Sequence, residues 1–251
     1  KKQRAFLAEI TAMDRAMGKL RKGLRGAGVA DNTLLWYCSD NGALPEVGSA
    51  GGRRGLKGQI YDGGLLVPAL LEWPGLSRAP KTITMPCVTS DIFPTVLEMA
   101  GVKMARQPPL DGISLLPILK GAEQKRGQPI GFWDNTAKGR GVPAKEWMQE
   151  LLAAQSRGEE PNIPERLIMD AGRIGPPVPL DSFPGHAAWV GWPWKLHRIE
   201  NSKTHAVKWE LYDLSADPVE GHALPVEGPG PGAALQAALA TWLTSVARSL
   251  N

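Results

Sequence analysis

A short apolar segment followed by a polar turn and a glycine-rich loop constrains the fold of this chain most strongly. Thr33 to Cys38 is rich in apolar and aromatic residues and too short for a helix, which predicts a central strand buried on both faces. It leads into Ser39-Asp40-Asn41-Gly42, and seven glycines follow between Gly48 and Gly64. A second buried-strand pattern spans residues 65–72. The order strand, glycine-rich loop, strand favours an α/β layer arrangement.

Helical patterns flank these strands. Apolar residues recur at steps of three and four through the first 25 positions, which predicts an amphipathic helix packed against a sheet or another helix. The apolar positions are Phe6, Ile10, Met13, Met17, Leu20 and Leu24. A second helix is predicted from Thr89 or Asp91 to Ala100, where Gly101 ends it.

The pattern changes near residue 130. A polar, Gly- and Pro-rich stretch over residues 131–188 is predicted to be an insertion or long loop, with one helix-like segment at 144–157. Trp189–Ile199 and Val207–Leu214 then predict an antiparallel hairpin, and a last helix begins at about Ala233. The predicted parts are an α/β part at 1–130, the insertion at 131–188 and a hairpin-plus-helix subdomain at 189–251. The buried stripe of the last helix is predicted to be Leu235, Leu239, Trp242, Val246 and Leu250.

Composition excludes several classes of protein. With 251 residues, 43% hydrophobic and 22% charged, the chain is long and apolar enough for a folded core, which excludes disorder and coiled coil. The net charge is +4, and eight basic residues lie in the first 25 positions beside the single aromatic Phe6, which favours a solvated helix face over a nucleic-acid surface. Leu65–Leu71 is too short for a membrane span. Cys38 and Cys87 provide no disulfide framework and are predicted to be buried thiols.

Two groups of residues carry candidate chemistry. Asp40 and Asn41 offer oxygen ligands suited to Ca²⁺ or Mg²⁺ at the end of a strand, although Asp-Asn-Gly is also ordinary turn sequence. Two such ligands cannot by themselves fill the coordination shell. In the glycine-rich loop, Arg53, Arg54 and Lys57 could bind an anion, and the alternative is an exposed connection. The loop does not match a Walker A motif.

The histidines and tryptophans lie towards the carboxyl end. His186 could border a pocket, whereas His197 and His205 are expected to be hairpin residues. Three tryptophans could stack on a sugar ring, but packing within the hairpin is favoured. They are Trp189, Trp192 and Trp194.

A series of segments along the chain carries a family resemblance. They are Leu34 to Gly42, Leu56 to Pro68, Trp73-Pro74-Gly75, Asp91 to Thr95 with Ala100-Gly101-Val102, Asp111 to Pro117, and Trp209 to Leu214 with Asp217-Pro218. In this order they resemble the second half of a type I, formylglycine-dependent sulfatase of the arylsulfatase family, within the alkaline phosphatase superfamily.

The resemblance implies a fold and an activity. The implied α/β fold has part of a large mixed sheet flanked by helices, as in alkaline phosphatase, plus a smaller C-terminal antiparallel sheet with a packed helix. It implies hydrolysis of a sulfate ester, on a small molecule or carbohydrate, to an alcohol and sulfate. Asp40 and Asn41 would be Ca²⁺ ligands, Lys57 would contact and stabilise the sulfate, and Asp62 would be structural. Members of the family are often periplasmic, secreted or lysosomal.

The chain also departs from the family pattern. The family's formylglycine forms within a Cys/Ser-x-Pro-x-Arg motif, and neither Cys38 nor Cys87 has that context. The remaining Ca²⁺ ligands and the residues that assist the leaving group would lie upstream of residue 1, so we expect the chain alone to be inactive. One alternative is a non-catalytic module that binds an anion or assembles as an oligomer or with a complementary N-terminal half. Another is a phosphatase or phosphonate hydrolase of the same superfamily, against which the segment around Lys57 argues.

Overall fold

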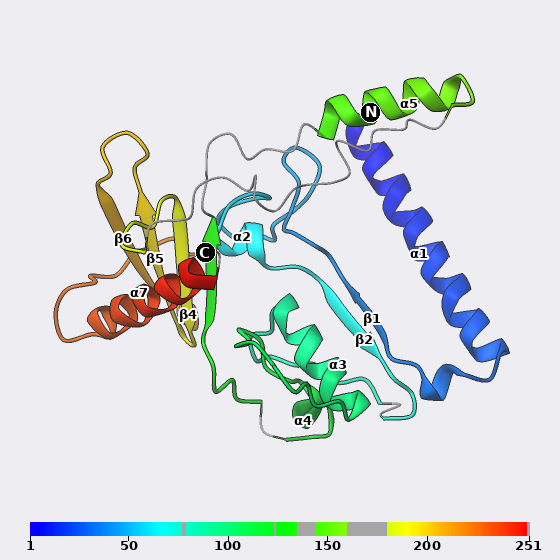
Figure 1. Cartoon of the computed structure of the whole chain (residues 1–251), viewed down its shortest axis with the longest axis horizontal. Helices are drawn as coiled ribbons and strands as arrows, with labels where there is room; N and C mark the ends of the chain where they lie inside the picture. The colour runs from blue at the N-terminus through cyan, green and yellow to red at the C-terminus, as the bar shows by residue number, and fades with distance from the viewer. Residues whose placement is uncertain (77–78, 123, 135–143, 160–179, 250–251) are drawn as a thin grey trace.

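The computed structural model describes residues 1–76, 79–122, 124–134, 144–159 and 180–249. Its elements form a mixed α/β fold arranged around two separate antiparallel sheets (Figure 1). The helices are α1 (Lys2–Gly26), α2 (Asp62–Leu65), α3 (Ile92–Ala100), α4 (Leu116–Leu119), α5 (Ala144–Ser156) and α7 (Gly232–Ser249), with short 3₁₀ turns at Ala30–Asn32 and Thr89–Asp91. The strands are β1 (Leu35–Cys38), β2 (Ala69–Glu72), β3 (Ile130–Asp134), β4 (His186–Gly191), β5 (Trp194–Glu200) and β6 (Val207–Asp213).

The first sheet consists of β1 and β2. They pair antiparallel, with Leu35 opposite Glu72 and Cys38 opposite Ala69, so the glycine-rich loop returns the chain alongside β1. The expectation of a central strand buried on both faces is wrong for this structure, since every residue of β1 is only half-buried. The physical reason is that, within the described ranges, this sheet has two strands and each has a neighbour on one edge only.

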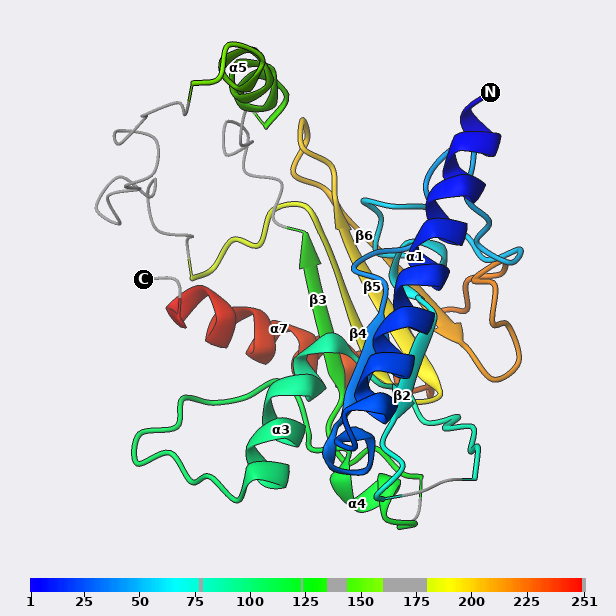
Figure 2. The ribbon, with the colours of Figure 1, turned by 90° about the vertical axis from the view of Figure 1, so that its right-hand side faces the viewer.

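Helix α1 confirms the predicted first helix but not its predicted packing. It lies beside β1 and β2 (Figure 2), where Arg21 Nε donates a 2.5 Å hydrogen bond to Glu72 Oε2. No residue of α1 is buried, and Leu7 on the apolar side is 54% exposed. The apolar stripe of α1 is therefore largely uncovered in the described part of the chain.

Helix α3 begins and ends as predicted. Gly101 follows it with a φ of 65°, which glycine adopts without steric cost. Asp91 precedes the helix and is completely buried, and its carboxylate accepts hydrogen bonds from the backbone N–H groups of Val88 and Ile113. Arg126 donates two more, at 2.8 and 3.0 Å, so one ion pair connects α3 to the segment before β3.

The second sheet has the strand order β3-β4-β5-β6, antiparallel throughout. The predicted β5–β6 hairpin is confirmed, but the run expected at Trp189–Ile199 is divided between β4 and β5 by a turn at Trp192–Pro193. Strand β3 was not predicted, and it falls where the insertion was expected to begin. Helix α5 matches the helix-like segment there, and the rest of that predicted insertion lies largely outside the described residues.

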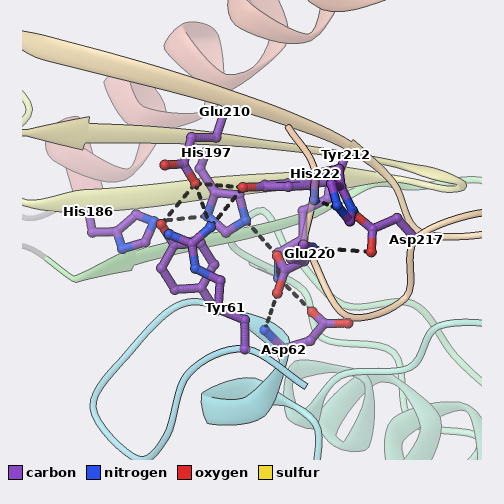
Figure 3. Close-up of polar contacts among 12 residues, drawn as sticks. Tyr61, Asp62, His186, His197, Glu210, Tyr212, Asp217, Glu220 and His222 are labelled. Atoms are coloured by element: carbon purple, nitrogen blue, oxygen red, sulfur yellow. Dashed lines mark hydrogen bonds and ion pairs between the residues drawn. The ribbon is translucent and has the colours of Figure 1, made fainter. Parts of the chain in front are cut away.

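The two faces of the second sheet differ in chemistry because side chains alternate along each strand. On one face Ala187 packs with Leu239 and Leu243 of α7, surrounded by aromatic rings that include Trp189. This confirms that Trp189 packs in the core, whereas Trp192 is 54% exposed. On α7 the prediction of Leu239 is right, but the buried positions Leu243 and Ala247 were missed. The opposite face carries buried polar and charged side chains next to the glycine-rich loop (Figure 3).

Two further expectations can be compared with the structure. Cys38 is half-buried and Cys87 is exposed, so the prediction of two buried thiols is wrong. Cys87 lies in the irregular segment before α3. Across the described ranges, none of the helices combines the length and the apolar character that crossing a membrane requires.

Candidate functional site

The turn after β1 is packed closely against the end of the glycine-rich loop. Gly42 N–H donates to Gly64 O at 2.9 Å, and Ala43 N–H donates to Gly63 O at 3.3 Å. A Cβ atom on Gly42 would lie 2.3 Å from Gly63 O, so only glycine permits this approach. The contact fixes where β1 ends and therefore where Asp40 and Asn41 lie.

Asp40 and Asn41 form a polar pair with an unsatisfied oxygen. Asn41 Oδ1 is buried and has no hydrogen-bond partner among the described residues. The carboxylate of Asp40 is exposed, and its pKa is lowered by hydrogen bonding from the Asn41 side chain and from backbone N–H groups, with a further contribution from the charge of Lys57. A buried amide oxygen without a donor, next to an ionised carboxylate, is a suitable pair of ligands for a hard cation.

Lys57 is brought to the same place by the backbone of the loop. Lys57 N–H donates to Ala43 O at 2.9 Å, two residues beyond Asn41. Gln59 Oε1 accepts from Leu56 N–H at 3.0 Å, and Gly58 has a φ of 87°, so the loop turns sharply just after Lys57. Lys57 itself is exposed. The structure therefore brings Lys57 close to Asp40 and Asn41, whereas the Arg54 side chain pairs with Glu210.

A buried network of charged and polar side chains lies on the other side of this loop (Figure 3). Lys195 Nζ is 2.5 Å from Asp62 Oδ1 and 2.9 Å from Glu220 Oε1, and both Lys195 and Glu220 are completely buried. Glu220 Oε2 accepts from Asp62 N–H at 2.6 Å. The network thus joins the start of α2 to β5 and to the segment after β6.

His186 belongs to this network. Its Nε2 is 2.8 Å from Nδ1 of His197, whose own Nε2 is 2.7 Å from Glu220 Oε1. Burial, together with the neighbouring His197, lowers the pKa of His186 to about 4. Burial also lowers the pKa of His197, although the hydrogen bond to Glu220 opposes the shift. His186 is half-buried beside Tyr61, with 5.2 Å between the ring centroids, so it lies against the glycine-rich loop.

Glu210 organises a second part of the same face. Its Oε2 accepts from Tyr61 OH at 2.9 Å, from Tyr212 OH at 2.8 Å and from Arg54 at 3.1 Å. Although burial alone would raise the pKa of Glu210, the hydrogen bonds from Lys208 and the two tyrosines, together with Arg54, lower it to about 2. Burial and the adjacent carboxylate raise the pKa of both tyrosine hydroxyls, which therefore remain protonated donors.

Sequence reasoning singled out His186 and Asp62 but missed the network that connects them. The signal available was the alternation of Lys195 with His197, opposite Tyr212 and Glu210 on the paired strand. Charged residues at every second position of a strand ordinarily indicate a solvent-exposed face. Here the glycine-rich loop covers that face. No group of three or more His, Cys, Asp and Glu side chains arranged to bind a metal is found in the ranges that the structure describes.

Comparison with known proteins shows what this part of the chain is similar to. Residues 2–102, which include Asp40, Asn41, Lys57 and Asp62, match the family model for sulfatases. Rat steryl-sulfatase is 36% identical over 129 residues, which is 48% of this chain and 22% of that protein. Choline-sulfatase of Rhizobium meliloti is 33% identical over 131 residues, or 51% of this chain and 24% of that protein. The matched part of the chain thus spans about a fifth to a quarter of these relatives.

Solved structures extend the similarity of fold over almost the whole chain. The crystal structure of Ps i-CgsB matches 93% of this chain and 41% of its own, with a TM-score of 0.64 and 22% identity. A structure from work on glycosaminoglycan metabolism by Bacteroides thetaiotaomicron matches 92% of this chain and 43% of its own, with a TM-score of 0.62 and 18% identity. The chain is therefore similar to a C-terminal portion of sulfatases, and almost all of it shares the mixed α/β fold of these two solved structures.

Proposed function

We propose that this chain supplies the Asp40, Asn41 and Lys57 part of a sulfate-binding site in a Ca²⁺-dependent sulfatase. The complete protein would hydrolyse a sulfate ester, on a small molecule or a carbohydrate, to an alcohol and sulfate. The observation that carries the proposal is the buried, unpartnered Asn41 Oδ1 beside Asp40, with Lys57 close enough to lower the pKa of Asp40.

Each of the three side chains has a stated part in this proposal. Asp40 and Asn41 would supply two oxygen ligands of an incomplete Ca²⁺ site, and the other ligands would come from outside this chain. Bound Ca²⁺ would contribute positive charge to sulfate binding. Lys57 would place an ammonium group against the sulfate oxygens and orient them, which stabilises negative charge at that point.

Calcium binding tests the proposal directly. In ¹H–¹⁵N NMR titrations of the whole chain, CaCl₂ should shift the amide signals of residues 40–43, with a Kd in the millimolar range because only two ligands are present. Subsequent addition of sodium sulfate should shift the signals of Lys57 and Gly58. The Asp40→Asn and Asn41→Ala variants should lose the calcium response, and Lys57→Met should lose the sulfate response alone. Sodium chloride at equal ionic strength is the control, and equal shifts in wild type and variants would refute the proposal.

The isolated chain is expected to leave aryl sulfates unhydrolysed. Its sequence contains no Cys/Ser-x-Pro-x-Arg segment, so binding and orientation would lack the nucleophile of the covalent step. The measurement is release of 4-nitrophenol from 4-nitrophenyl sulfate by the purified 251-residue chain. Turnover that co-purifies with the chain and is abolished by Lys57→Met would contradict this expectation.

A second candidate function is assembly with a complementary polypeptide. The observation that favours it is the exposed apolar surface on α1 and the open edges of β1 and β2 within the described residues. Leu70 of β2 is 71% exposed, which is unusual for a residue in an apolar strand. Under this proposal an α/β segment that carries further strands would pair with this sheet and cover α1.

A further inference from the structure

The loop that carries Lys57 is attached on two sides. On the first side its backbone is hydrogen-bonded to the turn after β1. Lys57 N–H donates to Ala43 O, and Gly64 O accepts from Gly42 N–H. On the second side it meets the C-terminal sheet, where Arg54 N–H donates to Val219 O at 3.3 Å and Asp62 N–H donates to Glu220 Oε2. The loop therefore bridges two parts of the chain that pair into separate sheets.

The second attachment is held by buried charge. Lys195 is completely buried, and its ammonium lies between the carboxylates of Asp62 and Glu220. Although burial alone would raise the pKa of Glu220, the hydrogen bond from His197 and the charge of Lys195 hold it below its ordinary value. Moving Asp62 away would leave the buried ammonium of Lys195 with one carboxylate fewer, which is energetically costly. The ion pair therefore restricts Asp62 to one position.

Glu220 is held in an uncommon backbone conformation. Its φ is 57°, in the left-handed region, which costs a non-glycine residue conformational energy. Both of its carboxylate oxygens are engaged, Oε1 with Lys195 and His197, and Oε2 with Asp62 N–H. These bonds offset the backbone cost and specify where the segment after β6 meets the loop.

We infer that Lys195 and Glu220 are positioning residues that act through Asp62 to hold Lys57 at its site. This inference rests on the proposed role of Lys57 in binding sulfate. Neither residue touches the anion: the C-terminal sheet supplies the buried charges, Asp62 transmits the constraint, and Gly63 N–H closes the loop onto Arg54 O at 2.7 Å. The C-terminal sheet would then stabilise the sulfate-binding loop in addition to enclosing its own core.

A matched pair of variants at Asp62 tests the inference. Asp62→Asn keeps the shape and the backbone N–H but removes the ion pair with Lys195, whereas Asp62→Glu keeps the charge. In hydrogen–deuterium exchange without added ligand, Asp62→Asn should speed exchange of residues 53–65 at least tenfold and leave residues 194–213 unchanged. Asp62→Glu should stay within about threefold of wild type. Lys195→Met is the second test variant, and Lys203→Met in the exposed β5–β6 turn is its charge-loss control.

Sulfate titrations by NMR separate the inference from the proposed function. The titrations are made at a temperature where all variants remain folded. Sulfate binding at Lys57 should be at least fivefold weaker in Asp62→Asn and in Lys195→Met, and close to that of wild type in Asp62→Glu. Unchanged exchange at residues 53–65 in Asp62→Asn, or equally faster exchange over the whole chain, would overturn the inference. If the wild-type chain binds no sulfate, the proposed function fails instead, and the exchange data alone decide whether the network positions the loop.

Discussion

The hydrogen bond between the two histidine rings fixes which nitrogen of each carries a proton. Glu220 is ionised and can only accept, so His197 Nε2 must carry hydrogen. Neutral His197 then presents Nδ1 as an acceptor, and His186 Nε2 must donate to it. Both rings are therefore expected to be Nε2–H tautomers, which leaves His186 Nδ1 without a proton. Long-range ¹H–¹⁵N NMR spectra of the imidazole rings check this assignment.

The lowered pKa of His186 predicts acid sensitivity. In the unfolded chain this ring protonates near pH 6.5, but in the folded chain only near pH 4. Between these values the unfolded state binds more protons, so the free energy of unfolding should fall as the pH is lowered from 6.5 to 4, by at most about 3 kcal/mol from this residue. Urea unfolding at several pH values should show a flatter dependence for His186→Gln than for wild type.

The control for this prediction is His222→Gln, since His222 is exposed. Its unfolding should keep the wild-type dependence on pH. Identical pH dependence in His186→Gln and wild type would show that the His186–His197 contact does not control acid stability.

At the scale of elements, the contact between β1 and the glycine-rich loop depends on the absence of side chains. Gly42→Ala would place a methyl group 2.3 Å from Gly63 O and 2.6 Å from Gly64 Cα, and these are backbone atoms. We expect a loss of about 1–3 kcal/mol in the free energy of unfolding, as for other overpacked positions. The calcium response of residues 40–43 should weaken as well, because the turn must move. Thermal and urea unfolding, with the NMR titration, measure both effects.

Gly18→Ala is the matched control for that substitution. Gly18 lies within α1, and a methyl group there would meet no atom within 4 Å. Alanine should stabilise the helix by about 0.5–1 kcal/mol and leave the calcium response unchanged. Equal stability changes at the two glycines would refute the argument from close approach.

Regular periodicity made several elements predictable. The helices α1 and α3 and the β5–β6 hairpin follow from apolar spacing and from the glycines or turn residues that end them. Strand β3 was missed because its sequence, Ile130-Gly131-Phe132-Trp133-Asp134, lies in a Gly- and Pro-rich context, and Gly131 disfavours a strand. Its glycine is explained only by tertiary structure, since a Cβ atom there would lie 2.4 Å from the Trp242 ring.

At the scale of the whole molecule, the candidate site divides into a predictable and an unpredictable part. Asp40, Asn41 and Lys57 lie within 18 residues, and the resemblance of the surrounding segments to sulfatases selected them, since Asp-Asn-Gly alone is also ordinary turn sequence. The network partners Asp62 and Glu220 are 158 residues apart. Charged residues at alternate strand positions indicate a solvated face unless another segment covers it, and only the folded chain shows that the loop does.

The uncovered apolar surface predicts association in solution. Leu7 and Ile10 of α1 are 54% and 41% exposed, and Leu70 lies on a strand with an unpaired edge in the described structure. Because burial of one leucine contributes about 1.5–3 kcal/mol, sedimentation velocity from 1 to 100 µM should show concentration-dependent self-association. Leu70→Glu should weaken the association constant at least tenfold, whereas Val102→Glu, at a comparably exposed position beyond α3, should not. If the chain is a monomer at every concentration, the proposal that this surface mediates assembly loses its support.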